Sequence, residues 1–447
     1  MKILQIYETG KVRPGGASVA TVVFHLSKCL TELGQDITVL ERGIGANPYL
    51  QKIGVKSIQV PLKEYASVPY IEVSKGFDGL MRLILDRTLL ALKFKGFIQR
   101  EDFDVIHVHF PFASSVLVNL RNSLGEKMVY TVHVGEEGKR FALEPSAPLA
   151  LRIFSPDLYL MRKVAKSIIL NETLKKKLIL KGIPEKKLEL IPHGVNVEDF
   201  NIRREEVERV RVRYGLEGTV VMFAGTVMPR KGVEYLIRAG EILKDEKVLF
   251  LIVGNLNINR EYAERVMEYA KRKEVNAKFT GFVPYEDLKA LYSACDIFVL
   301  PSLEEGFAIV LTEALASGKP LIGSNVGGTP MQIRDGWNGF LVDPENEKQL
   351  AEKIGYLVGN EGARLRMGKN SRKIAEEEFD WRKIAERYLK IYKEISMKHS
   401  TEYLNNNKRL INNFRKQFFK FILNAEKLIE NWLWKVELFR IPITNRF

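Results

Sequence analysis

The sequence predicts an α/β protein with two doubly wound domains, each a parallel sheet covered by helices on both faces. Three observations carry this prediction. The chain has 447 residues, which exceeds one ordinary core and suits two domains of about 180 residues each. Short apolar runs alternate with helical patterns through the first half, as they do in parallel sheets. The same alternation restarts after an expected linker at residues 191–196.

The apolar runs mark the expected strands. They cover residues 2–7, 37–40, 105–108, 128–132, 167–170 and 188–191 in the first half, and 220–224, 248–253, 297–300 and 321–323 in the second. Parallel strands end at a common edge of their sheet, so two such domains facing each other form a cleft in which ligands bind. A basic covering helix is expected over residues 80–99, and a final helix over 381–392.

Composition points to a globular protein with substantial cores, because 46% of the residues are hydrophobic and 28% are charged. Cys29 and Cys295 lack metal-ligand spacing, so we expect small buried side chains in a reducing compartment. The strand at residues 2–7 meets Glu8 at once, and no run of 18 apolar residues occurs. We therefore expect no secretion signal and no membrane span, and a cytoplasmic location.

The net charge of +14, with a pI near 9.4, calls for an anionic partner. No zinc finger, RNA-recognition motif or other nucleic-acid motif is present in the sequence. A phosphorylated substrate or a membrane surface is therefore favoured over nucleic acid.

Glu305 and Glu313 form the most informative pair. A turn after the strand at residues 297–300 carries Glu305 to the start of a helix expected over 307–317, with Glu313 about two turns further in. At ~1.5 Å per residue the two carboxylates are on the order of 10 Å apart, which suits a ligand with two polar ends, such as a nucleotide sugar. Free amides of residues 306–309 favour a diphosphate between them without a metal. The alternative is simple charge complementarity at a helix start.

A long motif surrounds this pair. It comprises Gly281–Pro284, Leu291–Tyr292, Cys295–Ser302, Gly318–Pro320, Val326–Pro330 and Asp335–Val342. The stretch 282–344 resembles the donor half of the retaining glycosyltransferases of family 4, whose signature is two glutamates with seven residues between them. The resemblance covers about residues 1–395 and implies the two-domain GT-B architecture.

The resemblance implies four regions. An acceptor-side Rossmann-like domain is expected over residues 1–192, and a nucleotide-sugar-binding Rossmann-like domain over 193–378. A helix over 379–395 returns to the first domain. Residues 396–447 lie outside the family core and form a basic amphipathic extension.

Two candidate features lie in the first half. Gly15 and Gly16 follow the first strand and precede a helical run, where a backbone can approach a phosphate closely. Their spacing is not the dinucleotide fingerprint, and such pairs are often structural. The resemblance implies contact with the donor diphosphate, and it places His133, at a strand end, beside the donor sugar. His107 and His109 end another strand and look like cleft architecture.

Arg230 and Lys231, after the strand at residues 220–224, supply the cations. A leaving nucleoside diphosphate accumulates negative charge, which preorganised Arg and Lys side chains can stabilise. The family usually has arginine where this chain has Thr226, and often glutamate where it has Met331. The implied catalytic set is His133, Arg230, Lys231 and Glu305.

The resemblance assigns Glu305 to the hydroxyls of the donor sugar, Glu313 to the ribose and Val283 to the nucleobase through backbone groups. The implied donor-binding set is Gly15, Gly16, Val283, Gly306, Phe307, Ala308, Ile309 and Glu313. The glutamates are too far apart for a retaining hydrolase pair, which needs carboxyls ~5 Å apart. No metal ion or other cofactor is expected. Asp102 and Asp104 resemble a metal-binding D-x-D motif, but they precede a buried strand and are expected near a helix end.

The expected function is retaining, metal-independent transfer of a hexose from a nucleotide-diphosphate sugar to a glycan or lipid-linked acceptor. A nucleotide-sugar epimerase of the same fold is one alternative. A non-catalytic module that binds sugar nucleotides or membranes is another.

The extension contains an apolar stripe at helical spacing. Residues 403–447 hold nine Lys or Arg against three Glu, as in a helix on anionic lipid. Packing on the enzyme or on another subunit is equally compatible with the pattern. A peripheral position on the inner face of the cell membrane is therefore one expectation.

Overall fold

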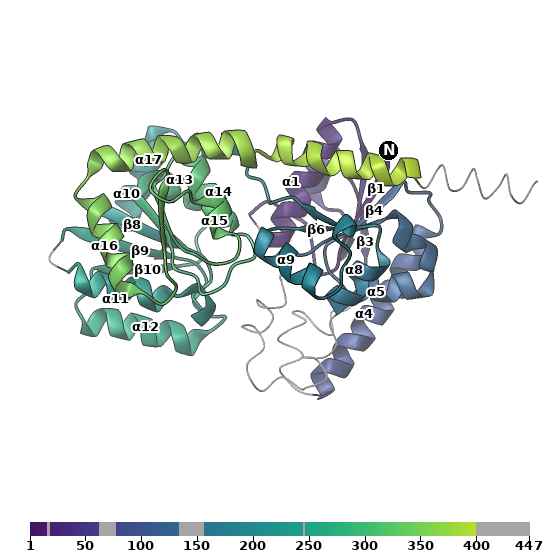
Figure 1. The fold of residues 1–447 in the computed structure, drawn as a ribbon, viewed down its shortest axis with the longest axis horizontal. Helices are drawn as coiled ribbons and strands as arrows, with labels where there is room; N and C mark the ends of the chain where they lie inside the picture. The colour runs from purple at the N-terminus through teal and green to yellow at the C-terminus, as the bar shows by residue number, and fades with distance from the viewer. Residues whose placement is uncertain (16–17, 62–76, 134–155, 245, 399–447) are drawn as a thin grey trace, which may run out of the picture. The chain divides into compact units, whose positions relative to one another are not determined.

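The structure is a computed structural model, and it describes residues 1–15, 18–61, 77–133, 156–244 and 246–398. Residues 1–392 form the first compact unit of the chain. Within the described residues, the first unit contains two parallel β-sheets with helices packed on them (Figure 1). The predicted class, two parallel-sheet α/β domains, is therefore confirmed.

Among the described residues, the first sheet has seven strands in the order β3-β2-β1-β4-β5-β6-β7. The chain starts at a central strand, winds to one edge and then crosses to the other, which is the doubly wound pattern. The strands are β1 (Lys2–Tyr7), β2 (Asp36–Arg42), β3 (Lys56–Val60), β4 (Val105–Val108), β5 (Met128–Thr131), β6 (Lys166–Ile169) and β7 (Leu188–Leu190). The described helices are α1 (Ser18–Glu32), α2 (Pro48–Lys52), α4 (Phe77–Ile98), α5 (Phe112–Leu120), α8 (Pro156–Lys163) and α9 (Glu172–Leu180).

In the described part of the chain, the second sheet has six strands in the order β10-β9-β8-β11-β12-β13. Its strands are β8 (Thr219–Ala224), β9 (Val248–Val253), β10 (Ala277–Gly281), β11 (Ile297–Leu300), β12 (Leu321–Ser324) and β13 (Gly339–Val342). Its helices are α10 (Arg204–Tyr214), α11 (Val233–Ile242), α12 (Arg260–Arg272), α13 (Tyr285–Ala294), α14 (Ile309–Ala316), α15 (Thr329–Gln332), α16 (Glu347–Val358) and α17 (Glu361–Ile374). Helix α11 packs against both α12 and α16, α10 packs against α13, and α14 packs against α17 (Figure 1).

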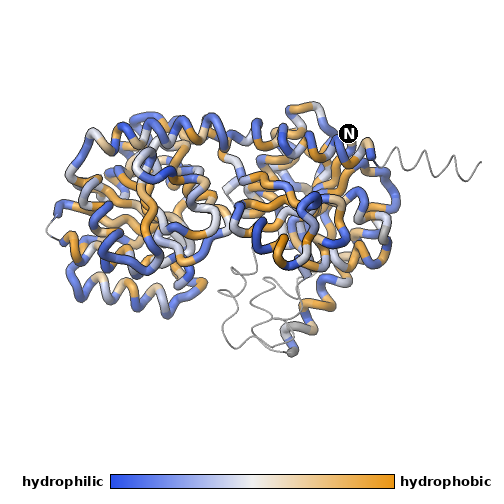
Figure 2. The backbone as a smooth tube through the Cα atoms, in the orientation of Figure 1, coloured by the Kyte–Doolittle hydropathy of each residue, from blue (hydrophilic) through white to orange (hydrophobic). Residues whose placement is uncertain are grey.

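The central strands form the two cores. Every residue of β4, β5, β9 and β11 is buried, and hydrophobic colour is concentrated in the interior around the two sheets (Figure 2). Such runs are expected where helices cover both faces of a parallel sheet. Cys29 and Cys295 are free and buried, as predicted.

Three strands were missed by the sequence prediction: β3, β10 and β13. All three lie at sheet edges. The side chains of β3 and β10 are mostly half-buried or exposed, and their sequences lack the continuous apolar run by which the central strands were found. Strand β13 has a short apolar run, which the sequence prediction did not assign to a strand.

The chain connects the two sheets twice. Residues 191–196 lead from β7 towards the second sheet, and the chain returns near Asp380 into a helix that begins at Trp381. The two connections are hydrogen-bonded, because the N–H of Val195 donates to the carbonyl of Phe379 at 2.7 Å. The final helix packs on the first sheet, where the Tyr392 hydroxyl lies 2.7 Å from Nδ1 of His107. Among the described helices, none combines the length and apolar character needed to cross a membrane.

Candidate active site

The turn after β11 carries Glu305 into a cluster of charged side chains. Its carboxylate accepts hydrogen bonds from Nζ of Lys231 and, at 3.0 Å, from Oγ of Ser302. A guanidinium nitrogen of Arg230 lies 3.7 Å from its other oxygen. Burial alone would raise the pKa of Glu305, but the two cations and the hydrogen bonds outweigh burial and lower the pKa. Glu305 is therefore an ionised carboxylate at neutral pH.

The cations come from the turn after β8. Gly232 closes this turn with a φ of 63°, and a Cβ there would lie 2.0 Å from the carbonyl oxygen of Pro301. Arg230 also donates to the carbonyl oxygen of Glu304 at 2.9 Å and accepts from the N–H of Leu303 at 2.8 Å. The left-handed glycine thus allows the two turns to pack directly against each other. This packing brings the predicted residues Arg230, Lys231 and Glu305 together.

A pair of glycines in the loop after β12 also supports the Glu305 turn. Gly327 has a φ of 51°, and a Cβ there would lie 1.6 Å from the carbonyl oxygen of Glu305. The N–H of Gly328 donates to the same oxygen at 3.3 Å. Bulkier residues at 327 and 328 would displace the turn that holds Glu305.

Helix α14 begins later than predicted, at Ile309 rather than Phe307, and this expectation was wrong. Tertiary contacts hold the preceding segment extended. Asn171 donates to the carbonyl of Gly306 at 2.6 Å, and Gln332 donates to that of Ala308 at 2.8 Å. The first N–H groups bonded to Ala308 are those of Leu311 and Thr312. The backbone N–H groups of residues 306–309, which were predicted to face the diphosphate, therefore make no hydrogen bond within the helix.

Glu313 lies four residues after the start of α14 and is 6% exposed. The hydroxyl of Tyr292 donates to its carboxylate at 2.7 Å, and the hydroxyl of Tyr285 lies 3.5 Å away. Burial raises the pKa of Glu313 to about 7, and the tyrosine hydrogen bonds oppose this shift only in part. Glu305 and Glu313 thus share one segment but have opposite pKa shifts.

Gly15 lies against Tyr285. It has a φ of 62°, and a Cβ there would lie 2.6 Å from Cγ of the tyrosine ring. The predicted glycine turn is therefore adjacent to the side chain that reaches Glu313. Gly16 lies outside the described residues. Val283 is buried between β10 and α13, which leaves its backbone as the part available for contacts.

His133 follows β5, and both of its ring nitrogens face other imidazoles. Its Nε2 lies 2.9 Å from Nδ1 of His109, and its Nδ1 lies 3.2 Å from Nε2 of His193. Its carbonyl oxygen lies 3.2 Å from the position of a Cβ on Gly306. The predicted histidine therefore adjoins the Glu305 segment through its main chain.

Asp102 and Asp104 lie at the opposite end of the sheet, before β4. Asp104 accepts from the N–H of Lys2 at 2.8 Å, and Asp102 accepts from Lys127 at 3.1 Å. They lie in the loop after α4, which ends at Ile98. Throughout the described residues, no group of three or more His, Cys, Asp or Glu side chains is arranged as a metal site.

Sequence reasoning missed Asn171, His193, Tyr285 and Tyr292 as site residues. One available signal was position, because Asn171 and His193 follow closely after β6 and β7, where parallel strands gather their ligand-binding groups. The sequence contains no such signal for Tyr285 and Tyr292, because their contacts with Glu313 depend on how α13 packs beside α14.

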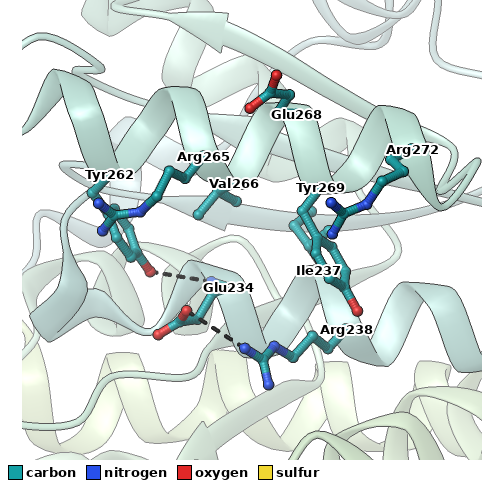
Figure 3. Close-up of a pocket in the computed structure, with 9 residues that line it drawn as sticks. All are labelled: Glu234, Ile237, Arg238, Tyr262, Arg265, Val266, Glu268, Tyr269 and Arg272. Carbon is teal, nitrogen blue, oxygen red and sulfur yellow. Dashed lines mark hydrogen bonds and ion pairs between the residues drawn. The ribbon is translucent and has the colours of Figure 1, made fainter.

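A separate cavity of about 370 Å³ lies between α11 and α12 (Figure 3). Its walls include Tyr262, Tyr269, Arg238 and Arg272, and it contains none of the predicted donor residues. The Tyr262 hydroxyl accepts from the N–H of Glu234 at 3.2 Å (Figure 3). This contact steadies the start of α11, which immediately follows the turn that carries Lys231.

Comparison with known proteins agrees with this geometry. Residues 15–199 match the model described as Glycosyltransferase Family 4, and residues 206–374 match Glycosyl transferases group 1. An uncharacterised glycosyltransferase of Methanocaldococcus jannaschii, MJ1607, is 30% identical over 305 residues, which are 67% of this chain and 77% of that protein.

One further relative and one solved structure span more of the chain. The D-inositol 3-phosphate glycosyltransferase of Kribbella flavida is 26% identical over 397 residues, covering 85% of this chain and 90% of that protein. The crystal structure of Anabaena HepE in complex with UDP and glucose superposes with a TM-score of 0.68 at 20% identity, covering 88% of this chain and all of that chain (100%). The fold is therefore GT-B, and the chain belongs to the group 1 glycosyltransferases of family 4 and is a glycosyltransferase enzyme.

Proposed function

We propose that this enzyme transfers a hexose from a nucleotide-diphosphate sugar to a glycan or lipid-linked acceptor, with retention of anomeric configuration and without a metal ion. The observation that carries the proposal is the ionised Glu305, held by Lys231 at the start of α14, with Glu313 eight residues further along. This arrangement offers one carboxylate to each end of a nucleotide sugar.

The diphosphate would lie between these carboxylates. The amides of residues 306–309 and the cations Lys231 and Arg230 would face it, and each favours negative charge. The charge on the leaving diphosphate grows as the glycosidic bond breaks, so groups already in place stabilise the transition state without reorganisation.

Arg230 would replace the arginine that the family usually has at the position of Thr226. Its guanidinium is 3.7 Å from Glu305 and 3.3 Å from the carboxylate of Glu304. It is thus placed beside the cluster, bonded to a carboxylate that a phosphate can replace as its partner.

Glu305 would orient the sugar hydroxyls and stabilise positive charge at the anomeric carbon. Glu313 would accept from the ribose hydroxyls, with Tyr285 and Tyr292 steadying it. Retention would follow attack by the acceptor on the face from which the diphosphate leaves.

UDP-sugars are the first donors to test, because HepE was solved with UDP and glucose and a second HepE structure with UDP-glucose. The experiment is a thermal-shift screen with UDP-, GDP- and ADP-sugars, followed by transfer assays with the donor that stabilises most. The anomeric configuration of the product is then read by NMR. A donor that reacts fully without any acceptor would favour the epimerase alternative, and an inverted product would overturn retention.

A further inference from the structure

Three histidines and one glutamine form a continuous hydrogen-bonded relay at the carboxyl edge of the first sheet. Oε1 of Gln5 lies 3.1 Å from Nε2 of His109, whose Nδ1 lies 2.9 Å from Nε2 of His133. Nδ1 of His133 in turn lies 3.2 Å from Nε2 of His193. We name these four residues the imidazole relay.

The spacing of the sheet explains why these side chains meet. Gln5 lies in β1, His109 directly follows β4 and His133 closely follows β5, which are successive neighbours in the sheet. The rings of His109 and His133 are 5.2 Å apart, close to the ~4.8 Å between adjacent strands. One imidazole with one hydrogen bond therefore spans about one strand interval.

Hydrogen-bonding rules give the relay a direction. Nε2 of Gln5 donates to Oγ of Ser27 at 2.9 Å, so the carbonyl oxygen of its amide faces His109. A carbonyl oxygen only accepts, and Nε2 of His109 must therefore carry a proton. Burial lowers the pKa of His109 and His133 well below their usual range, so each ring is neutral and has one N–H.

The proton on Nε2 of His109 then fixes the donor and the acceptor of each following hydrogen bond in the relay. With its proton on Nε2, His109 accepts at Nδ1 from Nε2–H of His133, which accepts at Nδ1 from Nε2–H of His193. Burial lowers the pKa of His193 to about 3, so this ring is neutral as well. Its Nδ1 is buried and has no hydrogen-bond partner in the described structure, which makes it the accepting end of the relay.

The relay ends on the segment that carries Glu305. The carbonyl oxygen of His133 lies against Gly306, and the ring of His193 meets the ring of Phe307 edge to face at 5.8 Å. The main chain of His133 and the imidazole of His193 thus contact the two residues that follow Glu305.

We propose that Gln5 is a positioning residue for glycosyl transfer: it orders the protons of the relay, keeps His133 protonated at Nε2, and thereby holds the Glu305 segment in place. This inference rests on the proposed function for its catalytic consequence. The proton order itself does not depend on that function.

The first experiment is nitrogen NMR of the imidazoles in the full-length protein, which has only six histidines. We expect His109, His133 and His193 to appear as neutral rings protonated at Nε2. A wild-type His133 protonated at Nδ1 would overturn the proposal without any variant.

The second experiment compares two variants. Gln5→Met keeps the side-chain length but removes the acceptor, so His133 should become a mixture of both neutral forms. Hydrogen exchange of residues 305–310 should accelerate, and turnover should fall by about 10- to 100-fold with donor KM little changed, because a small misplacement at a reacting centre is costly. Tyr392→Phe is the matched control, since it removes a buried hydrogen bond to His107, which lies beside the relay but outside it.

The outcomes separate the two proposals. A change in the His133 signals with unaltered exchange and turnover would show that Gln5 has no positioning role. If Tyr392→Phe lowers turnover equally, the effect of Gln5→Met is a general loss of stability, and Gln5 has no positioning role. If no sugar nucleotide supports transfer, the proposed function fails, while NMR and hydrogen exchange still decide whether the relay exists and holds the segment.

Discussion

Lys231 and Glu305 form a largely buried ion pair, with side-chain exposures of 13% and 6%. The cation predicted to face the diphosphate and the carboxylate predicted to orient the sugar therefore neutralise each other within one cluster. Breaking such a pair leaves an uncompensated buried charge, so each partner affects both stability and the site.

Lys231→Met should weaken donor binding and lower kcat/KM by about 100-fold or more, because its charge attracts the diphosphate before and during bond cleavage. Calorimetry with donor and steady-state kinetics measure the two effects. Lys273→Met is a suitable control, since it removes a lysine paired with Glu241 at the surface. If affinity and rate both stay at wild-type values, Lys231 does not contact the donor.

Glu305→Gln should be the most damaging subtle change at the site. It keeps the volume but removes the negative charge, so turnover at saturating donor should fall by about 100- to 1,000-fold while affinity changes less. Glu313→Gln is the matched comparison, because ribose bonding is similar before and during cleavage and its main loss should be donor affinity. Circular dichroism checks folding of both. Near-normal turnover in a folded Glu305→Gln enzyme would make this carboxylate structural.

Glu313 should make stability depend on pH. Its pKa is about 7 in the folded protein against 4.5 as the ordinary value, so the unfolded chain releases this proton first. The stability that Glu313 contributes is therefore fully present below pH 4.5. As the pH rises to about 7, the free energy of unfolding should fall by on the order of 3 kcal/mol. Denaturant unfolding between pH 4.5 and 8 should show this loss as a pH-dependent difference in the free energy of unfolding between wild type and Glu313→Gln. A constant difference across that range would contradict the raised pKa.

Transfer should continue undiminished in EDTA, because amides, Arg230 and Lys231 are the proposed partners of the diphosphate. Initial rates before and after chelation measure this directly. A loss of activity that manganese restores would overturn the metal-free mechanism.

Removal of residues 403–447, which lie outside the described structure, should lower binding to anionic vesicles and leave donor binding intact. Full-length binding should also weaken as ionic strength rises, since salt screens polybasic attraction to lipid. Vesicle sedimentation with anionic and neutral lipids measures both effects. Loss of an oligomer or unfolding on truncation would instead identify the apolar stripe as a packing surface.

Much of this protein follows from local sequence. The central strands were predicted because burial on both faces requires continuous apolar runs, while β3 and β10 were missed because these edge strands are partly exposed. Glu305 and Glu313 were found because a strand, a turn and a helix start lie within about twenty residues of sequence. The same reasoning placed α14 two residues too early, since contacts from Asn171 and Gln332 hold its first residues extended.

The sequence by itself determined the fold class, the family and the segments that carry the predicted site. Only the tertiary structure decided which side chains meet: Lys231 with Glu305 across 74 residues, and Gln5 with His109 across 104. Such contacts depend on the order of strands in the sheets and on the packing of one turn against another. Because neither strand order nor turn packing leaves a periodic signal along the chain, the ion pair, the tyrosines around Glu313 and the imidazole relay could be found only in three dimensions.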